Sequence, residues 1–130
     1  MFLDTSGLLC ALDRGQSAHA QATTAFDGMQ RGLTHNYVAA EFVALTLARR
    51  IPRMLSLQFI SELAFHPRVE FVWVDVDLHR RAMALLLAQL DKKYSLCDAV
   101  SFVLMRERNI DEVLSLDQDF EVAGFQRVLR

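Results

Sequence analysis

Four carboxylates in this sequence stand at predicted element ends or on apolar stretches, and together they could hold a divalent cation. Asp98 lies at the start of a helix whose interior, Ala99 to Met105, is apolar. A lone carboxylate there is costly to bury unless it caps the helix or meets a cation. Three further acids could meet the same cation: Asp4 after the first apolar run, Glu41 within the apolar run Tyr37 to Leu47, and Asp117 after the run Glu112 to Leu116.

Such a cluster favours metal-assisted cleavage of a phosphodiester. Carboxylates crowded into one pocket repel one another, which favours either protonation or the binding of a hard divalent cation. Oxygen ligands without His or Cys select Mg²⁺ or Mn²⁺. A cation held in this way polarises a phosphodiester and makes its bound water more acidic. The four acids therefore indicate a nuclease, provided that the fold brings them together.

Each acid also has a local interpretation. Asp4 and Asp98 can cap the helices that begin beside them. Glu41 lies one helical turn from Val38 and one from Leu45, so the spacing predicts that it points inward, where it has no salt-bridge partner at i+4. Asp117 has the weakest individual case. The four support one another, because each local interpretation would have to hold independently.

Composition limits the class of protein. The chain has 130 residues, of which 52% are hydrophobic, which predicts one domain over residues 1–130 with a substantial core. Charged residues make up 23% and the net charge is -2, so the chain is neither disordered by composition nor basic overall. Any RNA contact must be local. The candidates for phosphate contacts, which could equally be solvated surface, are Arg14, Arg49, Arg50, Lys92 and Lys93.

Cysteines and hydropathy suggest where the protein works. Cys10 and Cys97 are far apart, lie in apolar surroundings and lack C-x-x-C spacing, so we expect two reduced core thiols. The sequence shows no secretory signal and no apolar run long enough to cross a bilayer. These features predict a soluble, cytoplasmic protein without a membrane partner.

Strand and helix patterns alternate along the chain. Asn36 is the expected cap of the third helix, Asp75 or Asp77 that of the fifth, Gly32 the expected end of the second and Asn109 that of the sixth. The predicted strands are Met1–Leu3, Leu33–Thr34, Val69–Val74, Val113–Leu116 and Phe125–Leu129. The predicted helices are Leu8–Leu12, His19–Arg31, Tyr37–Arg50, Met54–Phe65, Leu78–Leu90 and Asp98–Arg108. This order favours an α/β fold with a mostly parallel sheet of four or five strands, covered on both faces, whose ligands gather at the carboxyl ends of the strands.

The contexts of the four acids carry a family resemblance. In order, they are FLDTSGLL, NYVAAEFVAL, YSLCDAVSFVLM and LSLDQDFEVAGF. Over almost the whole chain the sequence resembles the PIN-domain ribonucleases, and in size it is most similar to the VapC toxins of bacterial toxin-antitoxin pairs. The resemblance implies a three-layer α/β/α sandwich and cleavage of RNA that depends on Mg²⁺ or Mn²⁺.

The resemblance also implies site residues and partners. Asp4, Glu41, Asp98 and Asp117 match the acids of the family site, with Thr5, Ser6 and Ser115 as the hydroxyl residues beside them. The last motif holds two acids; Asp117 is preferred because it directly follows the strand, and Asp119 would support it or close the turn. A cognate antitoxin protein is implied, and we expect a homodimer. Apolar helical residues that could dock the antitoxin are Leu8, Leu12, Leu57 and Ile60.

Two other functions fit parts of the pattern. A PIN-like module could bind RNA or protein without cutting, and no sequence feature excludes it. A receiver-type signalling domain also places acids around Mg²⁺ and accepts phosphate on an Asp. That alternative fits poorly, because Asp4 stands alone after the first strand and Glu41 would have no role.

Overall fold

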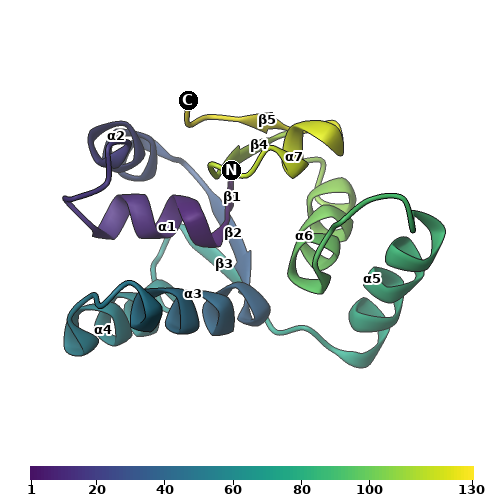
Figure 1. Cartoon of the computed structure of the whole chain (residues 1–130), viewed down its shortest axis with the longest axis horizontal. Helices are drawn as coiled ribbons and strands as arrows, with labels where there is room; N and C mark the ends of the chain where they lie inside the picture. The colour runs from purple at the N-terminus through teal and green to yellow at the C-terminus, as the bar shows by residue number, and fades with distance from the viewer.

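The computed structural model describes residues 1–130 and is built around five parallel strands (Figure 1). The strands lie in the order β3-β2-β1-β4-β5, and all four pairings between neighbours are parallel. Their bounds are β1 Phe2–Leu3, β2 Gly32–His35, β3 Val69–Val72, β4 Glu112–Leu114 and β5 Gln126–Arg127. The predicted parallel sheet is confirmed, and it has five strands where four or five were expected.

Helices cover both faces of this sheet, as the three-layer prediction requires. Figure 1 shows α1 to α4 on one side and α5 to α7 on the other. The helices are α1 Thr5–Leu12, α2 His19–Gly28, α3 Asn36–Ala48, α4 Arg53–Leu63, α5 Val76–Ala88, α6 Leu96–Glu107 and α7 Asp119–Val122. None of them is long and apolar enough to span a membrane.

The chain reverses its direction across the sheet between β1 and β4. After β1 it moves outward to β2 and β3, and after crossing back to β4 it moves the opposite way to β5. The carboxyl ends of β1 and β4 therefore form a topological switch point, the place where α/β sheets bind ligands. The order 3-2-1-4-5 also differs from the 2-1-3-4-5 order of receiver domains. The receiver alternative is wrong.

Gly7 allows α1 to pack directly against β4. A Cβ atom at this position would lie 1.9 Å from the carbonyl oxygen of Leu114. Only glycine permits such a close approach of two backbones. The contact brings the first turn of α1 beside the end of β4, and it therefore places Asp4 and Ser6 next to Ser115.

Several local predictions need correction. The second helix ends at Gly28, and Gly32 instead begins β2. His35 rather than Asn36 caps α3, since its Nδ1 accepts a hydrogen bond from the Val38 N–H, while the Asn36 side chain accepts one from Val74. Asp75 caps α5 and Asn109 adopts a left-handed φ of 54°, both as predicted.

The residues predicted to dock an antitoxin are less exposed than that prediction requires. Leu8 and Ile60, two of the predicted antitoxin-docking residues, are buried in the core, and Leu12 and Leu57 are half-buried. Core packing therefore uses this apolar face. The most exposed large apolar side chains of α3, α4 and the residues after α4 are Leu47, Met54, Leu55 and Phe65.

Candidate active site

Asp4 lies at the carboxyl end of β1 and is almost fully buried. It occupies the N-cap position of α1, yet its side chain makes no capping hydrogen bond. Instead Oδ2 accepts a hydrogen bond of 2.8 Å from the hydroxyl of Ser115, at the end of β4. Burial raises the pKa of Asp4 to about 7, and the charges of Asp98 and Glu41 add to this rise. The Asp4 side chain therefore does not cap α1, and it bonds to the end of β4 instead.

Asp98 both caps its helix and faces the other acids. Its backbone N–H donates to the Ser95 hydroxyl, and its Oδ2 accepts from the Ser95 N–H, each at 3.0 Å, which forms a capping box. Its side chain is buried, and this burial, followed by the charges of Asp117 and Glu41, raises the pKa of Asp98 to about 6. The capping interpretation is confirmed, and ligation of a cation by Asp98 stays a prediction.

Asp117 and Asp119 approach Asp98 together. One carboxylate oxygen from each of the three residues lies within 4.8 Å of the other two. The Asp117 N–H donates to Ser115 Oγ at 3.0 Å, and Asp117 Oδ1 accepts the Asp119 N–H at 2.9 Å. Burial and the charge of Asp117 raise the pKa of Asp119. The fold brings both Asp117 and Asp119 to Asp98, and the preference for Asp117 over Asp119 stays a prediction.

Glu41 does not point inward as its helical spacing predicts. Its side chain is exposed on α3, although its charge still acts on Asp4 and Asp98. The thiol of Cys97 lies among these acids: burial, followed by the charges of Glu41, Asp4 and Asp98, raises its pKa. The thiol therefore stays protonated. Glu41 stands at the solvent side of the cluster.

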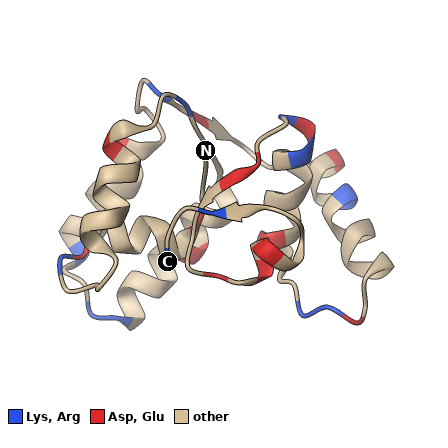
Figure 2. Ribbon diagram, turned by 90° about the horizontal axis from the view of Figure 1, so that it is seen from above, with Lys and Arg blue, Asp and Glu red and all other residues tan.

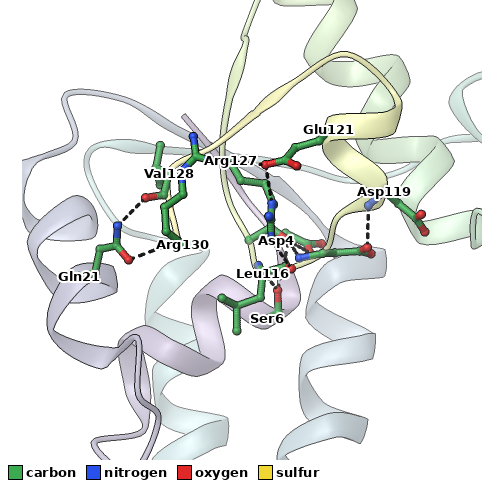
Figure 3. Close-up of polar contacts among 11 residues, drawn as sticks. Asp4, Ser6, Gln21, Leu116, Asp119, Glu121, Arg127, Val128 and Arg130 are labelled. Carbon is green, nitrogen blue, oxygen red and sulfur yellow. Dashed lines mark hydrogen bonds and ion pairs between the residues drawn. The ribbon is translucent and has the colours of Figure 1, made fainter.

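The predicted hydroxyl residues link the two strand ends. Ser6 Oγ lies 3.1 Å from Ser115 Oγ and accepts a hydrogen bond from the Leu116 N–H at 2.9 Å. Figure 3 shows this connection between α1 and the segment after β4. Thr5 differs, because its buried Oγ1 has no hydrogen-bond partner at all. Beside Asp4, such an orphaned oxygen is a place for a polar group from outside the chain.

The donor set fits a hard divalent cation. It consists of carboxylate oxygens, with no His and only a protonated thiol nearby. No Lys or Arg compensates them, since none of the salt bridges in the structure includes Asp4, Glu41, Asp98, Asp117 or Asp119. Repulsion among these acids is therefore relieved by protons or by a bound cation.

None of the predicted RNA-binding cations forms an ion pair with the acids of this cluster. Arg14, Arg49, Arg50, Lys92 and Lys93 are all exposed. Arg49 and Arg50 follow α3, and the charge of Arg49 acts on Asp13 after α1. Lys92 and Lys93 follow α5, and Lys92 lies 3.7 Å from Asp91. Figure 2 shows acidic segments from several elements near the centre, with most Lys and Arg toward the margins.

Sequence reasoning missed His35, a fully buried connection between the two helices that carry Glu41 and Asp98. His35 Nε2 lies 2.9 Å from Ser101 Oγ, and that hydroxyl donates to the carbonyl of Cys97. Ser101 therefore accepts from His35 Nε2–H, while Nδ1 accepts from Val38, which requires a neutral ring. Burial lowers the pKa of His35 to about 3. Local sequence patterns cannot reveal such a core contact, because Ser101 lies 66 residues after His35.

Comparisons with known proteins agree with this geometry. The sequence profile of the PIN domain matches residues 1–126. The chain is 30% identical to the 23S rRNA-specific endonuclease VapC20 from two strains of Mycobacterium tuberculosis, over 98% of this chain and 97% of the relative. It also matches the crystal structure of Mycobacterium tuberculosis VapC20, described as a sarcin-ricin loop cleaving toxin. That match has a TM-score of 0.88 and 27% identity, and covers 99% of this chain and 98% of that one.

Proposed function

This chain belongs to the PIN domain family and is a ribonuclease of the toxin class, and we propose that Asp4, Asp98, Asp117 and Asp119 hold its divalent metal, Mg²⁺ or Mn²⁺. One observation carries the proposal: the carboxylates of Asp98, Asp117 and Asp119 converge at the switch point of the sheet without a cation from the chain. A bound divalent ion supplies Lewis acidity to the phosphodiester.

The chain's own residues prepare this site. Ser115 donates to one oxygen of Asp4 and so orients that carboxylate, and the capping box fixes Asp98 at the start of α6. Glu41 is exposed. In this proposal it orients the attacking water, so it belongs to the catalytic set with a role different from that of the buried acids. No side chain acts as a covalent nucleophile in this proposal.

We propose structured ribosomal RNA as the substrate. Support comes from the relative, VapC20, which is named as specific for 23S rRNA. Arg49 and Arg50 follow α3, which carries Glu41, and Lys92 and Lys93 precede α6, which carries Asp98. Arg14 follows α1, the helix that begins beside Asp4. Phosphate contacts from these exposed side chains would position the RNA without reading its sequence.

A cognate antitoxin and a second copy of the chain are the proposed protein partners. The exposed side chains Leu47, Met54, Leu55 and Phe65 provide apolar surface for such contacts. Coexpression with the protein encoded beside this chain, followed by size-exclusion chromatography with light scattering, would show whether either partner binds. A monomer that forms no complex would contradict this part of the proposal.

The first experiment is to incubate the purified protein with total RNA and sequence the new 5′ ends. Reactions contain Mg²⁺, Mn²⁺ or a chelator, and Asp98→Asn is run alongside the parent. Asn keeps the shape and the capping acceptor of Asp98 but removes a charge. We expect new ends in ribosomal RNA that require metal and disappear in the variant.

Glu107→Gln is the matched control, because it changes an acid at the other end of the same helix. It should cleave like the parent. If the folded parent produces no new ends in any metal, the non-cutting binding module becomes the better function. If Asp98→Asn cleaves at the parental rate, the proposed metal site is wrong.

A further inference from the structure

Arg127 bonds to both sides of the segment that carries Asp117 and Asp119. It lies in β5, and only 13% of its side chain is exposed. Its Nη1 donates to the carbonyl of Leu116 at 2.6 Å, and its Nε donates to Glu121 Oε1 at 3.0 Å (Figure 3). Leu116 immediately precedes Asp117, and Glu121 lies in α7 two residues after Asp119. One guanidinium therefore spans the whole acidic segment.

The segment depends on side chains for its position. Between Leu114 and Asp119 the chain belongs to neither a strand nor a helix. The Leu116 peptide is held on both sides, since its N–H donates to Ser6 of α1 and its carbonyl accepts from Arg127 of β5. Both anchors lie outside the segment itself, so α1 and β5 add to the bonds within the segment, in which the Asp117 N–H donates to Ser115 and the Asp119 N–H donates to Asp117.

Electrostatic repulsion makes such anchoring necessary. One carboxylate oxygen from each of Asp98, Asp117 and Asp119 lies within 4.8 Å of the other two, and negative charges this close repel one another. Without an anchor this repulsion favours movement of the segment away from α6. A planar guanidinium with donors in fixed directions can hold two acceptors in one geometry, which a single ammonium group cannot do.

We infer that Arg127 is a positioning residue that holds Asp117 and Asp119 in place opposite Asp98. This inference rests on the proposed function, in which these carboxylates bind a divalent ion. Arg127 does not touch the acids themselves in this structure; it acts through Leu116 and Glu121. Residues that orient metal ligands typically change metal affinity or activity by about 10- to 100-fold when they are replaced.

The test is Arg127→Met, which keeps an unbranched apolar stem but removes every donor. In metal-free protein, hydrogen exchange measured by NMR should become faster at the amides of Leu116, Asp117 and Asp119. Mn²⁺ affinity, measured by electron paramagnetic resonance, should fall by about 10-fold. The kcat for RNA cleavage should fall while KM stays at the parental value. Arg127→Lys should recover only part of each loss.

Arg130→Gln is the matched control. Arg130 also approaches Glu121, at 3.7 Å, but 75% of its side chain is exposed and it makes no bond to Leu116. This variant should match the parent in exchange and Mn²⁺ affinity.

Several results would overturn the inference. The first is an Arg127→Met variant whose hydrogen exchange and Mn²⁺ affinity equal those of the parent. The second is a variant with a raised KM for RNA and parental Mn²⁺ affinity, which would make Arg127 an RNA contact. If Arg127→Met does not fold, the same measurements on Arg127→Lys decide. A parent that binds no Mn²⁺ would refute the proposed function instead, while the exchange of the metal-free amides would still test the anchor.

Discussion

Glu70 and Glu107, near the amino ends of β3 and β4, lie against arginines, whereas Asp4 and Asp117, at the carboxyl ends of β1 and β4, lie among other acids. Arg108 pairs with both glutamates, and Arg81 pairs with Glu107. Hydrogen bonds from these arginines lower the pKa of Glu70 and of Glu107. At the opposite end the pKa values of Asp4, Asp98 and Asp119 are raised.

At the amino ends of the strands, arginines pair with the carboxylates. At the carboxyl ends, the carboxylates form no ion pair with any residue of the chain. Paired surface carboxylates contribute modestly to stability and need nothing further. Buried, unpaired carboxylates destabilise the folded chain unless protons or cations bind. We therefore expect a cation to bind at the acidic end, and the following experiments test whether the two ends really differ.

The largest effect is expected for cleavage. Asp119→Asn should lower the rate of RNA cleavage by about 100-fold or more, because metal ions contribute several kcal/mol to such reactions and each 1.4 kcal/mol is about tenfold. Asp111→Asn, an exposed acid just before β4, is the control and should cleave normally. Parental cleavage by Asp119→Asn, measured in a quenched-time assay, would leave Asp117 as the sole acid of this motif.

Metal binding should stabilise the protein more at pH 8 than at pH 5. At saturating Mn²⁺, about 100 times Kd, the gain at pH 8 should be about 3 kcal/mol. At pH 5 Asp4 and Asp98, with pKa values of about 7 and about 6, carry protons that compete with the ion. Thermal unfolding with Mn²⁺ or chelator measures this gain. An equal gain at both pH values would argue against binding at these acids.

Without metal, Asp4→Asn should stabilise the protein at pH 8 by about 1 to 3 kcal/mol. The folded pKa of Asp4 is about 7 and its ordinary value is 3.8, so parental stability falls as pH rises between these values. Urea unfolding in chelator should show the parent and variant converging below pH 4. Glu70→Gln, at the paired end, should instead destabilise slightly at pH 8. A gain from Asp4→Asn that does not change with pH would contradict this explanation.

His35 should produce the opposite pH dependence in the same experiment. Its folded pKa is about 3 and its ordinary value is 6.5, so its contribution is complete above pH 6.5 and is lost as pH falls toward 3. Between these values the loss amounts to about 1.4 kcal/mol for each step of one in pH. His35→Gln should therefore flatten the acid limb of the stability curve measured by urea unfolding. An unchanged acid limb would show that other groups control it.

The smallest effect is expected for the paired end. Arg108→Gln removes partly exposed ion pairs to Glu70 and Glu107 and should cost less than about 1 kcal/mol. RNA cleavage should stay at the parental rate. A large loss of cleavage in the folded variant, measured beside its urea unfolding, would mean that the two ends of the sheet are coupled.

The accuracy of the sequence predictions follows from the range of the interactions. Local patterns predicted a strand at Val69–Val74 and a helix at Asp98–Arg108, and both form, at Val69–Val72 and Leu96–Glu107. The cap of α3 was wrong because His35 gains its second partner, Ser101, from a helix far along the chain. Glu41 was predicted to point inward from periodicity, but the neighbours that would cover it are not local, and it is exposed. No sequence pattern indicated a role for Arg127.

The sequence by itself determined the order of the strands and of every helix except α7, the acids near their ends and the family to which the chain belongs, because apolar periodicity and short motifs are local properties. Only the tertiary structure decided which acids meet. The reversal of the chain between β1 and β4, together with the close approach that Gly7 permits, brings Asp4, Asp98, Asp117 and Asp119 to one edge. The tertiary structure also leaves these four acids without an ion pair to any Lys or Arg.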